Sequence, residues 1–129
     1  MQTEPLLQLV IDALNEMKGR DLAVLDLIGK TTVMDYMVIA SGTSERHVKA
    51  MAGRLVERAK AERVLPLGIE GERAADWIVV DLGDVTVHLM LPQTRAFYNL
   101  EKLWSVAPAL TGSESAAEAE AETEAVSHA

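Results

Sequence analysis

The stretch that decides the fold reads Asp76-Trp77-Ile78-Val79-Val80-Asp81-Leu82-Gly83-Asp84-Val85-Thr86-Val87-His88-Leu89-Met90. Two runs rich in β-branched residues flank Leu82-Gly83-Asp84, and a glycine can adopt the positive φ that a short chain reversal requires. Both runs carry apolar residues on both faces, as strands covered on two sides do. The stretch therefore predicts a β-hairpin whose strands are buried on both faces.

A helix is predicted directly after this hairpin. Pro92 fits the first turn of a helix, and Phe97, Leu100 and Trp104 recur at i, i+3 and i+7. This spacing puts the three side chains on one face, so we expect a single helix that buries all three.

The chain before the hairpin alternates between helical and strand patterns. In order, we predict a helix that Thr3 caps and that ends at about Gly19, strands over 22–27 and 36–41, a helix from Ser44 to about Arg63 and a short strand over 67–69. The expected buried positions of the two helices are Leu6, Leu7, Val10, Ala13, Leu14 and Met17, followed by Val48, Met51, Ala52, Leu55, Val56 and Ala59. This order predicts an α+β fold, in which a single domain holds a mixed five-stranded sheet flanked by helices.

Composition separates a domain from a tail. The chain has 129 residues, and its last 25, from Ser105, contain five Glu but no Lys or Arg. Such a segment lacks the large apolar side chains that offset the entropy of ordering. We therefore predict a domain over residues 1–105 and a disordered acidic tail over 106–129, which carries most of the net charge of −8. The chain has no Cys and its first residues show no export signal, which favours a cytoplasmic location.

Charge is distributed unevenly within the predicted domain. The predicted helix over 44–63 carries six basic and three acidic residues, whereas the segment 70–84 carries five carboxylates and one Arg. On one interpretation both are ordinary solvated surfaces. On the other, the acidic segment recognises a basic partner. The basic helix could instead contact phosphates, but it lacks the interleaved aromatics and Gly-rich motif of nucleic-acid binders.

No nucleotide site can be assembled from the residues. The turn Gly42-Thr43-Ser44 before a helix presents amides that could bind a phosphate. The nearest carboxylate pair for magnesium, Glu70 and Glu72, lies a whole helix away. A short turn with Ser44 as a helix cap is the simpler interpretation.

The remaining polar residues of the predicted domain point to structure rather than catalysis. Asp81 and Asp84 flank a turn, where carboxylates accept local backbone amides. His88 lies in the middle of a strand, where a packed or hydrogen-bonded ring is typical, and His47 and His128 lie far from it in the sequence. We therefore expect no catalytic, cofactor or metal site and no enzyme activity.

Several segments closely resemble the ribosomal silencing factor (RsfS, or Iojap) family. They are Asp35–Ser44, Gly68–Gly71, Asp76–Val85, Val87-His88 and Phe97–Trp104, and in this order they extend the resemblance over residues 4–105. The resemblance implies a nucleotidyltransferase-like fold without that activity. It also implies binding to the large ribosomal subunit through ribosomal protein L-fourteen, which excludes the small subunit and represses translation when nutrients run short. A homodimer, an RNA-binding adaptor in ribosome assembly and a magnesium-dependent nucleotidyltransferase stay open.

Aromatic and acidic residues indicate where a basic partner would bind. Trp77 begins a predicted strand beside Asp76, and aromatic side chains with charged neighbours are common interface anchors, with half-buried packing as the alternative. Tyr98 and Glu101 lie three positions apart on one flank of the last predicted helix. From position and charge, the predicted partner-binding residues are Glu70, Asp76, Trp77, Asp81, Tyr98 and Glu101.

Overall fold

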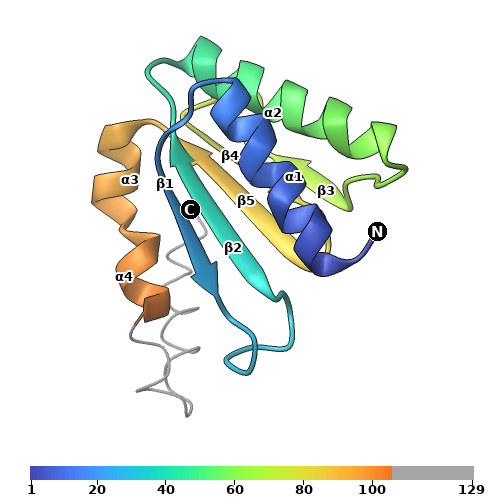
Figure 1. The fold of residues 1–129 in the computed structure, drawn as a ribbon. Coiled ribbons are helices and arrows are strands. Elements are labelled where there is room, and N and C mark those ends of the chain that lie inside the picture. Colours follow the sequence, from blue (N-terminus) through green and yellow to red (C-terminus); the bar gives the residue numbers. More distant parts are fainter. Residues whose placement is uncertain (106–129) are drawn as a thin grey trace.

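The computed structural model describes the backbone of residues 1–105 and the side chains of residues 1–102. The elements are α1 (Thr3–Glu16), β1 (Arg20–Asp26), β2 (Tyr36–Ser41), α2 (Glu45–Ala61), β3 (Gly68–Glu70), β4 (Trp77–Asp81), β5 (Val85–Met90), α3 (Pro92–Tyr98) and α4 (Leu100–Ser105), as Figure 1 shows. The predicted tail over 106–129 and the side chain of Trp104 lie outside the described residues.

The five strands form one sheet in the order β1-β2-β5-β4-β3. β2 and β5 run parallel, and the other neighbouring strands run antiparallel. The predicted hairpin is β4 and β5, and β5 lies between β2 and β4 in the interior of the sheet. The prediction of an α+β domain with a mixed five-stranded sheet is therefore confirmed.

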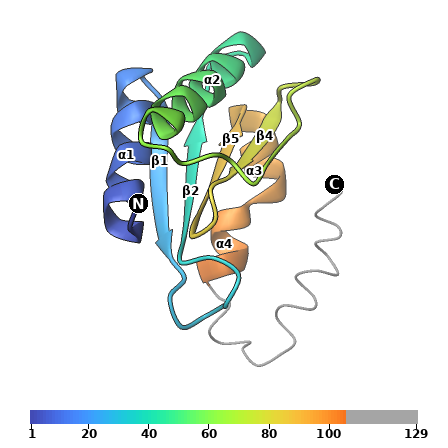
Figure 2. The same ribbon diagram turned by 90° about the vertical axis from the view of Figure 1, so that its right-hand side faces the viewer.

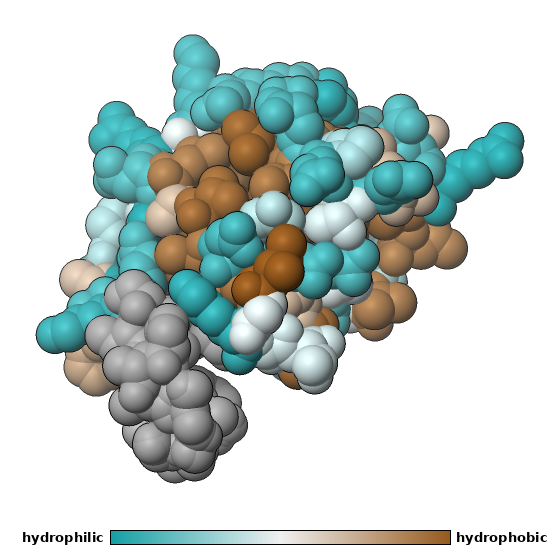
Figure 3. Space-filling model, turned by 60° about the horizontal axis from the view of Figure 1, so that its bottom comes forward, coloured by the Kyte–Doolittle hydropathy of each residue, from teal (hydrophilic) through white to brown (hydrophobic). Residues whose placement is uncertain are grey.

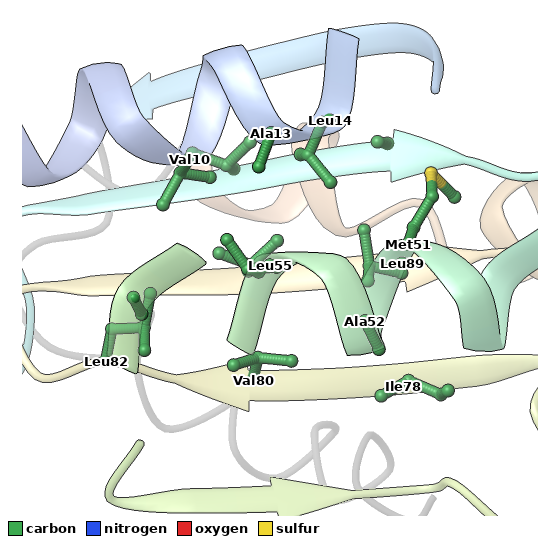
Figure 4. Close-up of a cluster of buried hydrophobic side chains, with 14 of the residues drawn as sticks. Val10, Ala13, Leu14, Met51, Ala52, Leu55, Ile78, Val80, Leu82 and Leu89 are labelled. Atoms are coloured by element: carbon green, nitrogen blue, oxygen red, sulfur yellow. The ribbon is translucent and has the colours of Figure 1, made fainter. Parts of the chain in front are cut away.

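Helices α1 and α2 cover one face of the sheet, and α3 and α4 lie against the other (Figures 1 and 2). The larger core forms under α1 and α2, where Val10, Leu14, Met51 and Leu55 are fully buried. Figure 4 shows these side chains pointing toward Leu89 and other residues of the strands. The predicted apolar stripes of both helices are confirmed, because residues three or four apart share one helical face.

The smaller core lies on the opposite face, and here the prediction of one long helix after Pro92 is wrong. Asn99 adopts a left-handed conformation with φ of 48°, which ends α3 and starts α4 in a new direction. The spacing of three and four residues therefore does not continue across Asn99. Leu100 is buried against Met37 and Ile39 as expected, but the side chain of Phe97 is 79% exposed.

The helix boundaries test the predicted caps. Ser44 caps α2 as predicted, because its hydroxyl accepts a hydrogen bond from the amide of His47 at 3.1 Å. Thr3 does not cap α1. It lies inside the helix and its hydroxyl donates to Asp84 at 2.8 Å, so it fastens α1 to the turn between β4 and β5.

Several large apolar side chains remain exposed among the described residues, including Ile28, Val33, Leu65 and Leu67. Figure 3, which turns the lower side of the molecule forward, shows apolar residues gathered between hydrophilic ones. Isolated exposed apolar side chains are ordinary in soluble domains. A binding site must therefore be identified from exposed side chains that are grouped and oriented together.

Candidate partner-binding site

The strand register brings three of the predicted site residues to one face of the sheet. Glu70 pairs with Val79, Trp77 with Met90, and Asp81 with Thr86. Directly opposite residues on neighbouring strands point to the same side. Glu70, Trp77 and Asp81 therefore lie on the face opposite α1 and α2, which is the face that α3 and α4 approach.

Trp77 and the end of α3 form a row of aromatic rings on this face. The Trp77 and Tyr98 ring centroids lie 4.7 Å apart at an angle of 46°, and Phe97 meets Tyr98 edge-on at 4.9 Å. Trp77 is half-buried against the smaller core, whereas Tyr98 and Phe97 are exposed. We call His88, Trp77, Tyr98 and Phe97 the aromatic row, and it extends from the sheet to solvent.

His88 anchors the inner end of the aromatic row. The indole Nε1–H of Trp77 donates to Nδ1 of His88 at 2.9 Å, so the neutral His88 ring carries its proton on Nε2. Burial lowers the pKa of His88 from 6.5 to about 4, because desolvation disfavours the charged ring. The predicted role of His88 as a packed, hydrogen-bonded side chain is thus confirmed.

Arg95 connects α3, on which it lies, to α4 and to the end of β2. Its guanidinium donates two hydrogen bonds to Glu101, at 3.1 and 2.7 Å, and a third to the Ser41 hydroxyl at 2.9 Å. The hydrogen bonds from Arg95 hold the pKa of Glu101 below its ordinary value. Such a bidentate pair is geometrically specific. Glu101 therefore fixes the helix junction that carries Tyr98.

The remaining carboxylates divide into two kinds. Asp81 accepts the amide of Gly83 at 2.9 Å and so stabilises the turn of the hairpin. Glu70 is exposed and Asp76 is half-buried. Neither side chain has an ion-pair or hydrogen-bond partner within residues 1–102. These two carboxylates remain available to a partner.

Gly71 explains how Glu70 is brought close to the aromatic row. Its φ is +89°, and a Cβ at this position would lie 2.0 Å from the carbonyl oxygen of Trp77. Only glycine tolerates both the positive φ and this close approach. The turn at Gly71 therefore packs directly on the first residue of β4.

The structure brings Glu70, Trp77 and Asp81 to one sheet face and stacks Tyr98 on Trp77, but it gives the six predicted residues unequal roles. Trp77 and Tyr98 stack, while Asp81 and Glu101 are satisfied internally. Phe97 and His88 belong to the aromatic row but are not among the residues predicted from the sequence. The Phe97-Tyr98 pair could have signalled the first, but the apparent helical stripe assigned Phe97 to the core.

The turn before α2 shows no catalytic arrangement. Nδ1 of His47 accepts the amide of Thr43 at 2.9 Å, and Nε2 donates to the carbonyl of Met17 at 2.8 Å. Both ring nitrogens are thus engaged with the backbone, and Ser44 serves as the cap. In the described part of the chain, no three acidic or imidazole side chains cluster closely enough to bind a metal ion. None of the helices up to residue 105 is long and apolar enough to cross a membrane.

Comparison with known proteins identifies relatives of this chain. The family model described as "Ribosomal silencing factor during starvation" matches residues 1–129. A ribosomal silencing factor of Zymomonas mobilis is 48% identical over 101 residues, which cover 78% of this chain and 76% of that protein. A mouse protein named "Mitochondrial assembly of ribosomal large subunit protein 1" is 40% identical, over 78% of this chain and 45% of its own length.

A solved structure matches the fold as well. The crystal structure of a protein from Chromobacterium violaceum superimposes with a TM-score of 0.80 at 39% sequence identity. The match covers 81% of this chain and 88% of that one. The sheet and its helices are therefore shared with a protein whose sequence is also similar.

Proposed function

Because the chain belongs to the ribosomal silencing factor family, we propose that it represses translation by occupying the large ribosomal subunit and excluding the small subunit. The observation that carries the proposal is the aromatic row, which shares a sheet face with Glu70 and includes Trp77, the residue that follows Asp76 in the sequence. The name of the mouse relative, which refers to assembly of the large subunit, supports the choice of subunit.

The chemistry of the site favours a basic protein surface, and we propose ribosomal protein L-fourteen as the partner. Phe97 and Tyr98 offer apolar area, and aromatic residues dominate the energetics of many interfaces. Glu70 and Asp76 supply negative charge, which attracts a basic partner and orients it. A standard interface buries about 800 Å² on each partner, which a domain of this size can provide.

On this proposal, the protein inhibits translation without any chemical reaction. A protein that occupies the intersubunit face blocks the small subunit by its volume alone. The fraction of blocked subunits then follows the free protein concentration relative to its dissociation constant. Repression would therefore respond to protein abundance in the cytoplasm, and nutrient limitation is the condition we propose for it.

Sedimentation with separated ribosomal subunits tests this proposal. The protein should follow the large subunit and, at saturation, reduce the yield of joined ribosomes. The variant Tyr98→Ala should weaken binding at least tenfold, because it removes an exposed, stacked ring from the centre of the site. Sedimentation with the small subunit alone would contradict the proposal, as would unchanged subunit joining at saturating protein.

A pair of charge reversals tests the acidic part of the site. Glu70→Lys combined with Asp76→Lys should weaken large-subunit binding at least tenfold. The matched control reverses Asp12 on α1 and Glu62 at the C-cap of α2, which are exposed and belong to the helical layer on the opposite face. The control should leave affinity within about twofold. Equal effects of the two pairs would mean that only overall charge matters and that the assignment of this site is wrong.

A further inference from the structure

Helix α2 carries two groups of cations that differ in their partners. Arg54 and Arg58 form ion pairs with Glu16 of α1, and Arg54 also pairs with Glu57. These arginines therefore tie α2 to α1. Lys49 and Lys60 are exposed, and no side chain within residues 1–102 pairs with either of them.

The unpaired lysines border a hollow between α2 and strands β3 and β4. Its volume is about 310 Å³, and Val56 and Ile69 contribute to its apolar lining. Gly53 lies between the lysines on α2, and a Cβ built there would meet no atom within 4 Å. The hollow is therefore open above Gly53, with a cation near each end of its helical side.

The sequence after Ser105 has the complementary chemistry. It carries five Glu and no basic residue, and from Glu118 to Ala125 each Glu is followed by Ala or Thr. Small side chains suit a shallow apolar floor, and the carboxylates match the lysines in charge. Glu72 lies on the strand side of the hollow and would repel the carboxylates of this segment. These carboxylates would therefore lie near α2 rather than near the sheet.

Distances along the chain agree with this match. Lys49 and Lys60 are eleven residues apart on a helix, which corresponds to about 16 Å at about 1.5 Å per residue. An extended chain advances about 3.3 Å per residue, so carboxylates four to six residues apart span about 13–20 Å. The 24 residues after Ser105 reach about 80 Å when extended, which exceeds the width of a domain of about 100 residues.

We propose that the acidic segment 113–126 docks in this hollow of its own molecule, with its glutamates on Lys49 and Lys60. Individual exposed ion pairs are weak and screened by salt, but attachment to the same chain raises the effective concentration to about the millimolar range. The docked segment neutralises the unpaired cations of α2. It thereby reduces attraction of this face to RNA phosphates, which would otherwise compete with recognition of a specific partner.

Zero-length carbodiimide crosslinking of the full chain tests the proposal. At low salt, crosslinks from Glu118, Glu120, Glu122 and Glu124 should join Lys49 and Lys60 at least five times more often than Lys18 or Lys30. The two control lysines are exposed near the end of α1 and in the loop between β1 and β2. The preference should disappear at about 0.5 M salt, where the screening length is only a few ångströms. Equal yields at all four lysines would overturn the proposal.

Isotope mixing and amide shifts complete the test. In a mixture of ¹⁴N- and ¹⁵N-labelled protein, crosslinks should join residues of the same molecule, and mixed pairs would instead assign the hollow to a second copy.

The NMR chemical shifts of the Gly53 and Ile69 amides should change with salt in the native chain, while that of Gly29, in an open loop position, should not. Replacing the four glutamates with Gln should abolish these shifts. Unchanged shifts in that variant would overturn the proposal.

Discussion

The burial of His88 predicts how the stability of the domain depends on pH. Burial lowers the pKa of His88 from 6.5 to about 4, so between these values the unfolded chain binds more protons than the folded one. Stability is then fully present above pH 6.5 and is lost as the pH falls toward 4. The full pKa difference corresponds to about 3 kcal/mol of stability, at about 1.36 kcal/mol per pKa unit. Because the ring is only half-buried, we expect about 1–2 kcal/mol of this to be observed.

Two substitutions of His88 separate its titration from its hydrogen bond. His88→Gln keeps an oxygen that can accept the indole N–H of Trp77 but does not titrate, so the loss of stability between pH 6.5 and 4.5 should disappear. His88→Leu leaves that N–H without an acceptor and should cost about 1–3 kcal/mol at pH 7. Urea unfolding of the full chain, followed by circular dichroism at each pH, measures both effects. A change in stability appears as a change in the urea concentration at the unfolding midpoint, while the dependence of the unfolding free energy on urea concentration stays constant.

The pH window excludes the carboxylates as the cause. Arg54 lowers the pKa of Glu16, and Arg95 lowers that of Glu101. Carboxylates with lowered pKa values lose their stabilising effect only as the pH falls below about 4.5. The same loss between pH 6.5 and 4.5 in native protein and in His88→Gln would refute the role assigned to His88.

Two further substitutions, each with a matched control, test the supports of the site. Gly71→Ala should destabilise the domain by about 3 kcal/mol and weaken partner binding, because its Cβ would overlap a strand carbonyl at 2.0 Å. The control Gly83→Ala has a similar φ of +95° but open surroundings, so it should cost only about 1–2 kcal/mol in the same urea titration. Equal losses of stability in Gly71→Ala and Gly83→Ala would contradict the importance of the close contact. Glu101→Gln should cost about 1–2 kcal/mol by weakening its bonds to Arg95. Glu57→Gln, on an exposed pair, should cost about 0.3–0.5 kcal/mol or less, and a larger loss than in Glu101→Gln would contradict the argument.

Local sequence patterns by themselves determined the elements of this fold. The alternation of strand and helix, the cap at Ser44 and the reversal at Gly83 all follow from residues within a few positions of each other. Apolar spacing also determined which sides of α1 and α2 are buried. These features depend on backbone preference and on the hydrophobic effect along one element, so they can be predicted without knowing the neighbours of that element.

Only the tertiary structure decided which elements meet. Thr3 has the chemistry of a helix cap, yet it bonds to Asp84 because α1 lies beside the hairpin turn. Phe97 has helical spacing typical of a core residue, yet the left-handed Asn99 leaves its ring exposed beside Tyr98. The site itself joins β3, β4 and α3 through the pairing of strands distant in sequence. Such contacts join elements that are distant in sequence, so they depend on how the whole chain packs around its two cores. The backbone preferences of individual segments do not determine that packing.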